Sequence, residues 1–197
     1  PQADEQQRLL ANLITKMNGN RTPLPRFWYL PRDEKAAIIM TGDDHATGGT
    51  AGRFDQYIAA SPAGCSVVNW DCIRSTSYIY TATPLTNAQA ASYTAQGFEV
   101  SLHVSIDNSC KAWPQGGLDT QYYTPQLNAF LAKYTSVPAP VTSRTHCVEW
   151  ADWATQPKVE LAHGIRFDTN YYYYPGAWMA NKPGFMTGSG FPMRFAD

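Results

Sequence analysis

The sequence predicts an α/β fold in which parallel strands alternate with helices, as they do in a (β/α) barrel. Short apolar runs typical of buried strands alternate with segments of helical pattern. Polar residues of the kinds used in catalysis follow the ends of several of these runs, where barrel enzymes place their active sites. The length of 197 residues and the apolar content of 44% allow one substantial hydrophobic core.

The first predicted element is a helix over residues 4–17, whose apolar side chains recur at helical spacing. A proline-flanked extended stretch at residues 27–30 leads to the first core strand, residues 36–41, which is apolar enough to be buried on both faces. We therefore expect an N-terminal helix with an extended lead-in, residues 1–35, followed by a barrel domain, residues 36–197.

The barrel domain is predicted to repeat the alternation of strand and helix. Thr86 and Gln89 match a capping box, and Thr124 followed by Pro125 is typical of a helix start. Further strands are expected at residues 66–70, 98–104, 141–146 and 165–170, and helices at residues 53–60, 86–97, 124–134 and before Gly164. These units are fewer than a closed ring needs, so we expect an incomplete barrel that continues beyond residue 197.

Composition excludes some classes of function. The 15 basic and 16 acidic residues give a net charge of −1, without the basic surplus that nucleic-acid binding requires. No apolar run approaches the roughly 20 residues of a transmembrane helix. Tyr172, in a run of tyrosines, and Trp178 could stack on the sugar rings of a carbohydrate substrate, although alternate tyrosines of a strand would equally fill a core.

The four cysteines indicate disulfides rather than a metal site, because no closely spaced Cys-x-x-Cys pair is present. Their spacing favours the pairs Cys65–Cys72 and Cys110–Cys147. Disulfides persist in oxidising compartments, so we expect an extracellular or periplasmic protein.

Acidic and imidazole side chains follow three of the predicted strands. Asp43, Asp44 and His45 come after the first, His103 ends the third, and His146 ends the fourth. Because the carboxyl ends of parallel strands share one edge of a sheet, we expect these groups to meet around a divalent cation. Two plainer interpretations stay open: Asp43 and Asp44 could form a solvated turn that caps the next helix, and each histidine could be an ordinary hydrogen-bonded residue.

Three motifs resemble those of the polysaccharide deacetylase, or NodB-homology, superfamily. Thr41-Gly42-Asp43-Asp44 is similar to the first motif, Thr-Phe-Asp-Asp. His103-Val104-Ser105-Ile106-Asp107 is similar to the second, with Asp107 where the family has a second histidine. Arg144-Thr145-His146-Cys147 takes the place of the third, Arg-x-Pro-Tyr. The resemblance implies a divergent member of the superfamily with a distorted (β/α) barrel.

The resemblance also implies roles for single residues. Asp43 would be the general base, Asp44 and His103 would be metal ligands, and His146 or Asp107 would supply the third ligand. His45 would be an additional ligand or polar site residue. Arg144 is expected to contact the substrate.

The function implied is a metal-dependent hydrolase that removes acetyl groups from a polysaccharide, with zinc as the expected metal. One alternative is a non-catalytic glycan-binding, extracellular matrix or surface protein that keeps the fold. Another is a glycoside hydrolase, whose two carboxylates would stand about 5–10 Å apart across a cleft.

Overall fold

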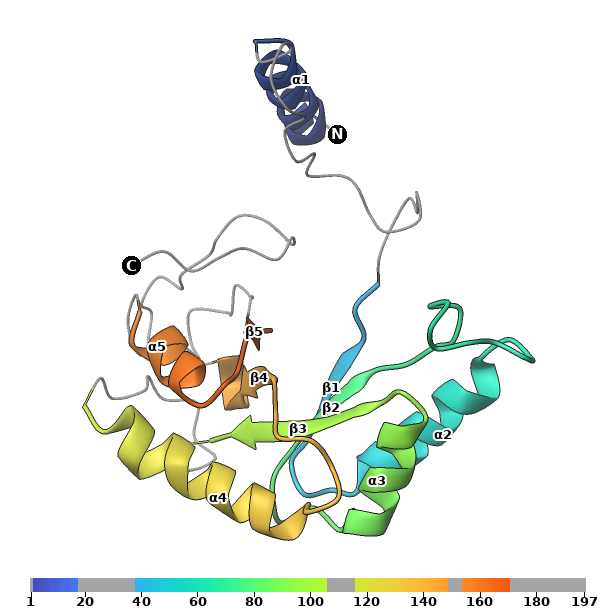
Figure 1. Cartoon of the computed structure of the whole chain (residues 1–197), viewed down its shortest axis with the longest axis vertical. Coiled ribbons are helices and arrows are strands. Elements are labelled where there is room, and N and C mark those ends of the chain that lie inside the picture. The colour runs from blue at the N-terminus through green and yellow to red at the C-terminus, as the bar shows by residue number, and fades with distance from the viewer. Residues whose placement is uncertain (1, 18–37, 106–115, 149–153, 171–197) are drawn as a thin grey trace. The chain divides into compact units, whose positions relative to one another are not determined.

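The computed structural model describes residues 2–17, 38–105, 116–148 and 154–170 (Figure 1). The chain divides into two compact units, Pro1–Ile39 and Met40–Asp197. The first contains helix α1 (Gln2–Met17), which confirms the predicted N-terminal helix. Within the described residues no helix has the length and apolar character needed to cross a membrane.

The second unit is built on a sheet of five parallel strands in sequential order. The strands are β1 (Thr41–Asp44), β2 (Thr76–Ile79), β3 (Glu99–Val104), β4 (Thr142–Thr145) and β5 (Phe167–Asp168). Connections between parallel neighbours are right-handed, so a sequential order places every crossover on the same side of the sheet, as in a (β/α) barrel. The predicted α/β fold class is confirmed, and the strands form an open, curled half of such a barrel.

Within the described residues, four helices and two short helical turns connect the strands. They are α2 (Gly49–Ala60), α3 (Asn87–Ala95), α4 (Thr124–Lys133), α5 (Thr155–Ala162), η2 (Leu118–Tyr123) and η3 (His146–Val148). The predicted capping box is present at α3, where the backbone N–H of Gln89 donates to Thr86 Oγ1 at 3.2 Å and the backbone N–H of Thr86 donates to Gln89 Oε1 at 2.9 Å. Helices α3 and α4 both pack against β3 (Figure 1).

The first strand begins later than predicted. Residues 38–40 precede the strand, and the side chains of Ile38 and Ile39 are 86% and 63% exposed. The apolar run therefore marks an approach to the sheet rather than a buried strand. The pairing of β1 with β2 includes Asp43 and Asp44, which consequently lie inside a strand and not in the loop after it.

The prediction of a strand at residues 66–70 is wrong. These residues form consecutive turns that are closed by a disulfide between Cys65 and Cys72. Trp70 has a φ of 61°, which no extended strand allows. The second strand instead follows the disulfide loop.

The two faces of the sheet differ in polarity. The face covered by helices carries Val100, Leu102 and Val104, which belong to the hydrophobic core. Side chains alternate along a strand, so Ser101 and His103 point to the opposite face. That face is polar: Ser101 Oγ, for example, donates to the backbone of β4 at 2.9 Å.

A pair of acidic residues, of which Glu160 is buried and Asp168 half-buried, lies on the helix-covered face. Asp168 of β5 and Glu160 of α5 share a hydrogen bond, and Glu160 Oε1 also accepts from Tyr123 Oη at 2.6 Å and from Gln156 Nε2 at 3.2 Å. Burial raises the pKa of both carboxyl groups, and the charge of Glu160 raises that of Asp168 further.

The raised pKa values of Glu160 and Asp168 predict that the free energy of unfolding depends on pH. Because both pKa values are raised by folding, the stabilisation is complete below the ordinary carboxyl pKa of about 4 and is lost as pH rises through the higher folded values. We expect Glu160→Gln to flatten the fall in unfolding free energy between acidic and neutral pH. Urea denaturation at a series of pH values measures this, and identical pH profiles for the variant and the wild type would contradict it.

Candidate metal centre

Three histidines from separate strand ends meet at one edge of the sheet. His45 follows β1, His103 lies in β3 and His146 follows β4. Nε2 of His45 lies 3.2 Å from Nε2 of His103 and 3.3 Å from Nδ1 of His146. Because the carboxyl ends of parallel strands share this edge, residues up to 101 positions apart in sequence come into contact.

Hydrogen bonding and burial prepare the imidazole of His103 for a metal. Its Nδ1 lies 2.8 Å from the carbonyl oxygen of Arg144, which can only accept, so Nδ1 carries the proton and Nε2 presents its lone pair to the other histidines. The side chain is fully buried, and burial lowers the pKa of His103 to about 3. Burial, followed by the charge of His45, also lowers the pKa of His146. Both rings are therefore neutral near pH 7, as metal ligands must be.

Two of the separations between these nitrogens match those in a tetrahedral site, and all three ligand atoms lie within 4.8 Å of one another. Zinc–imidazole bonds of about 2.0–2.1 Å place two ligand nitrogens about 3.3–3.4 Å apart in a tetrahedral site. The separations around His45 Nε2 are 3.2 and 3.3 Å. A single ring proton on His45 would satisfy only one of these two contacts well, whereas one divalent cation would satisfy all three nitrogens. The donor set therefore fits a zinc-like metal with one coordination position left open.

Asp43 lies beside the histidines on the polar face of the sheet. Its Oδ1 is 3.0 Å from Nε of Arg144, whose Nη1 donates to Thr41 Oγ1 at 3.2 Å. Both partners are partly exposed, at 24% for Asp43 and 28% for Arg144. Burial raises the pKa of Asp43, whereas the charge of Arg144 acts in the opposite direction. An accessible carboxylate held by a guanidinium is a suitable proton acceptor.

Asp44 faces away from the histidines, because neighbouring residues of a strand point to opposite faces. Its side chain is 1% exposed, and its two oxygens accept six hydrogen bonds, from the amides of Thr47, Gly48 and Thr50 and from the hydroxyls of Thr47, Thr50 and Thr83. Burial alone would raise the pKa of Asp44, but these hydrogen bonds outweigh it and lower the pKa. The carboxylate therefore organises the loop that begins α2.

This geometry predicts that replacing Asp44 lowers the stability of the protein but leaves its zinc binding intact. We expect Asp44→Asn to lower the free energy of unfolding by about 3 kcal/mol, because an amide nitrogen would face buried donors. The variant should still bind one equivalent of zinc. Chemical denaturation and metal titration measure the two effects. Loss of zinc by a variant that is as stable as the wild type would instead make Asp44 a ligand.

The structure thus brings together most of the predicted site residues that it describes. His103, His146 and the additional candidate His45 form one cluster, and Asp43 and Arg144 lie beside it. Asp44 is adjacent to Asp43 in sequence, but its carboxylate accepts hydrogen bonds from Thr50 on the other face of the sheet. The signal that favoured His45 was its place directly after the acidic pair, where the strand ends.

The remaining predictions concern the disulfides and residues that the structure does not describe. The disulfide between Cys65 and Cys72 has an S–S distance of 2.02 Å and lies in the loop between α2 and β2. Cys147 is also disulfide-bonded. Four predicted residues lie outside the described part of the chain: Cys110, Asp107, Tyr172 and Trp178.

Comparison with known proteins adds little to this picture. No family model matches the chain, and no curated protein matches it. Among solved structures, it is similar to a crystal structure of a mutant of BA3943, described as a CE4 family pseudoenzyme with restored enzymatic activity. The TM-score is 0.43 and the identity 13%, over 66% of this chain and 44% of that chain. So weak a likeness carries no functional conclusion, and the match spans less than half of that chain.

Proposed function

We propose that the protein is a metal-dependent hydrolase that removes acetyl groups from a polysaccharide or related glycan, with zinc as the metal. The observation that carries this proposal is the convergence of three imidazole nitrogens, with separations of 3.2 and 3.3 Å around His45 Nε2. A carboxylate, Asp43, lies on the same polar face of the sheet as His103 and Arg144. The motif around Asp43 that resembles the deacetylases supports acetyl groups as the target.

Each side chain has a distinct task in this proposal. His45, His103 and His146 hold the metal, which when bound supplies a Lewis acid for the acyl carbonyl and lowers the pKa of a water molecule. Asp43 accepts a proton from the water that attacks the acyl carbon. Arg144 positions the Asp43 carboxylate through the ion pair at 3.0 Å.

The geometry supports acyl hydrolysis better than cleavage of the glycosidic bond. Glycoside hydrolases use two carboxylates that face each other across a cleft. Here Asp43 is paired with Arg144, and Asp44 is buried on the other face of the sheet. This adjacent acid pair therefore cannot supply the facing carboxylates.

We also propose an extracellular or periplasmic location. The support is the disulfide between Cys65 and Cys72, since such bonds persist in oxidising compartments. The same environment would contain structural polysaccharides.

The test is acetate release from acetylated xylan and chitin by protein loaded with zinc, before and after treatment with a chelator. We expect release only from the loaded protein, and none from His146→Ala. His163→Ala is the matched control, because His163 pairs with Asp119 at 2.6 Å, outside the cluster. Polymer binding without metal retention or acetate release would overturn the enzyme and favour a non-catalytic glycan-binding protein.

A further inference from the structure

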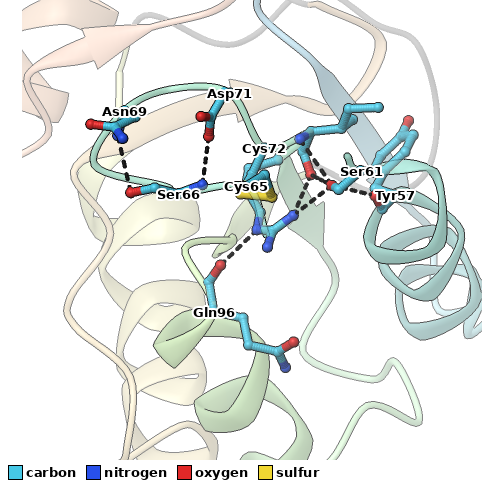
Figure 2. The surroundings of a disulfide bond; sticks show 10 residues. Tyr57, Ser61, Cys65, Ser66, Asn69, Asp71, Cys72 and Gln96 are labelled. Atoms are coloured by element: carbon cyan, nitrogen blue, oxygen red, sulfur yellow. Dashed lines mark hydrogen bonds between the residues drawn. A yellow bond between two sulfur atoms is a disulfide. The ribbon is translucent and has the colours of Figure 1, made fainter. Parts of the chain in front are cut away.

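A disulfide and several hydrogen bonds constrain the loop between α2 and β2. The disulfide closes residues 65–72 into a small ring with a Cα–Cα distance of 5.2 Å (Figure 2). Inside the ring the Ser66 amide donates to Asp71 Oδ1 at 2.5 Å, and the Trp70 amide donates to the carbonyl of Val67 at 3.1 Å. The conformation of the ring is therefore fixed before any partner arrives.

The base of the loop is fixed to the rest of the sheet domain. Arg74 donates to the carbonyl of Gln96 at 2.6 Å and to Ser61 Oγ at 3.0 Å. Val67 packs so closely on Gly97 that a Cβ at the glycine would lie 2.7 Å from Val67 Cγ1. These contacts bind the loop to the turn between α3 and β3.

This rigid loop presents apolar side chains to solvent. Trp70 is 71% exposed and Val68 is 79% exposed. Trp70 also adopts a left-handed φ of 61°, which costs a bulky residue about 1 kcal/mol or more. An exposed indole contributes little to the core, so folding alone does not account for a strained tryptophan held outward by a disulfide ring. Such strain is typical of binding sites.

The loop lies at the opposite end of the sheet from the histidines. It precedes β2, so it meets the amino end of that strand at Thr76, whereas the histidines gather at the carboxyl ends. A ligand on Trp70 would therefore occupy a surface separate from the metal centre.

We infer that the loop at residues 65–72 binds a polysaccharide chain, with a sugar ring stacked on the indole of Trp70. A pyranose ring has an apolar face of C–H groups and a rim of hydroxyls, which matches a flat aromatic ring between exposed polar residues. Asn69 and Asp71 flank the tryptophan and are both exposed. The loop would hold the polymer while the distant site acts on it.

Two other partners fit the loop less well. Residues 65–72 carry one acidic and no basic side chain, so an anionic bilayer would repel rather than attract them. A stable protein partner needs about 800 Å² of surface on each side, far more than a ring of this size offers. The choice of a polysaccharide rests on the proposed function, but binding at Trp70 requires no catalysis.

Binding of the chelator-treated full chain to insoluble chitin and to acetylated xylan tests the inference. Trp70→Gly removes the indole and suits the left-handed backbone, and it should bind about tenfold more weakly, the change expected for a loss of about 1.4 kcal/mol. Trp70→Tyr keeps a flat ring and should retain most of the binding. Leu161→Ala removes an apolar side chain that is 70% exposed on α5, and it should bind like the wild type.

The inference fails if Trp70→Gly binds both polymers as tightly as the wild type. It also fails if the substitution abolishes only self-association or binding to anionic phosphatidylserine vesicles. Acetate release from a short soluble substrate separates this result from the proposed function. If release is absent in every variant but polymer binding still depends on Trp70, the loop site stands and the proposed reaction does not.

Discussion

Asp43→Asn should reduce the turnover number for acetate release by about 10²–10⁴-fold, the usual contribution of a general base. The amide keeps the shape of the side chain but cannot accept the proton of the attacking water. Zinc content and unfolding free energy should stay close to those of the wild type, because Asp43 neither belongs to the histidine cluster nor lies in the core. Acetate release at saturating substrate measures the effect.

Asp119→Asn is the matched control for this substitution. It also removes a carboxylate that lies beside a basic side chain, but that side chain is His163 rather than Arg144. We expect turnover by Asp119→Asn to equal that of the wild type. If Asp43→Asn retained more than about half of the activity, Asp43 would not be the base.

His45→Ala should weaken zinc binding by more than about 100-fold, which is the upper range for losing a residue that only orients a ligand. His45 Nε2 is the nitrogen that lies within 3.3 Å of both other histidines, so its loss leaves an incomplete ligand set. Its side chain is exposed, so the free energy of unfolding of the metal-free protein should change little. Competition with a chromogenic chelator measures the affinity.

The outcome for His45 also distinguishes two ligand sets. If Asp44 held the metal with His103 and His146, removing His45 would leave zinc affinity nearly intact. Unchanged affinity in His45→Ala, together with lost affinity in Asp44→Asn, would contradict the cluster of three histidines.

The alternation of strands and helices was predictable because local signals agree with the fold. Thr86 and Gln89 form a capping box in the structure, as their spacing predicts, and the helix that begins at Thr124 and Pro125 is present. Residues 66–70 misled the prediction, because two valines and a tryptophan are typical of a strand. The disulfide that folds them into turns connects residues outside that segment.

The arrangement of the site was predictable only in part. Strand ends that carry His103 and His146 indicated which edge of the sheet to examine, and the structure brings these residues together. The sequence could not show that β1 extends through Asp44, because the apolar residues before Thr41 resemble the strand itself. Since alternation inside a strand turns Asp44 to the other face, His45 becomes the side chain that reaches the cluster.

The most direct test is a crystal structure of the zinc-loaded protein with anomalous data collected at the zinc absorption edge. We predict a single strong peak among His45 Nε2, His103 Nε2 and His146 Nδ1, about 2.0–2.1 Å from each nitrogen. A peak bound to the Asp44 carboxylate, or no peak within reach of the three rings at saturating zinc, would contradict the metal centre proposed here.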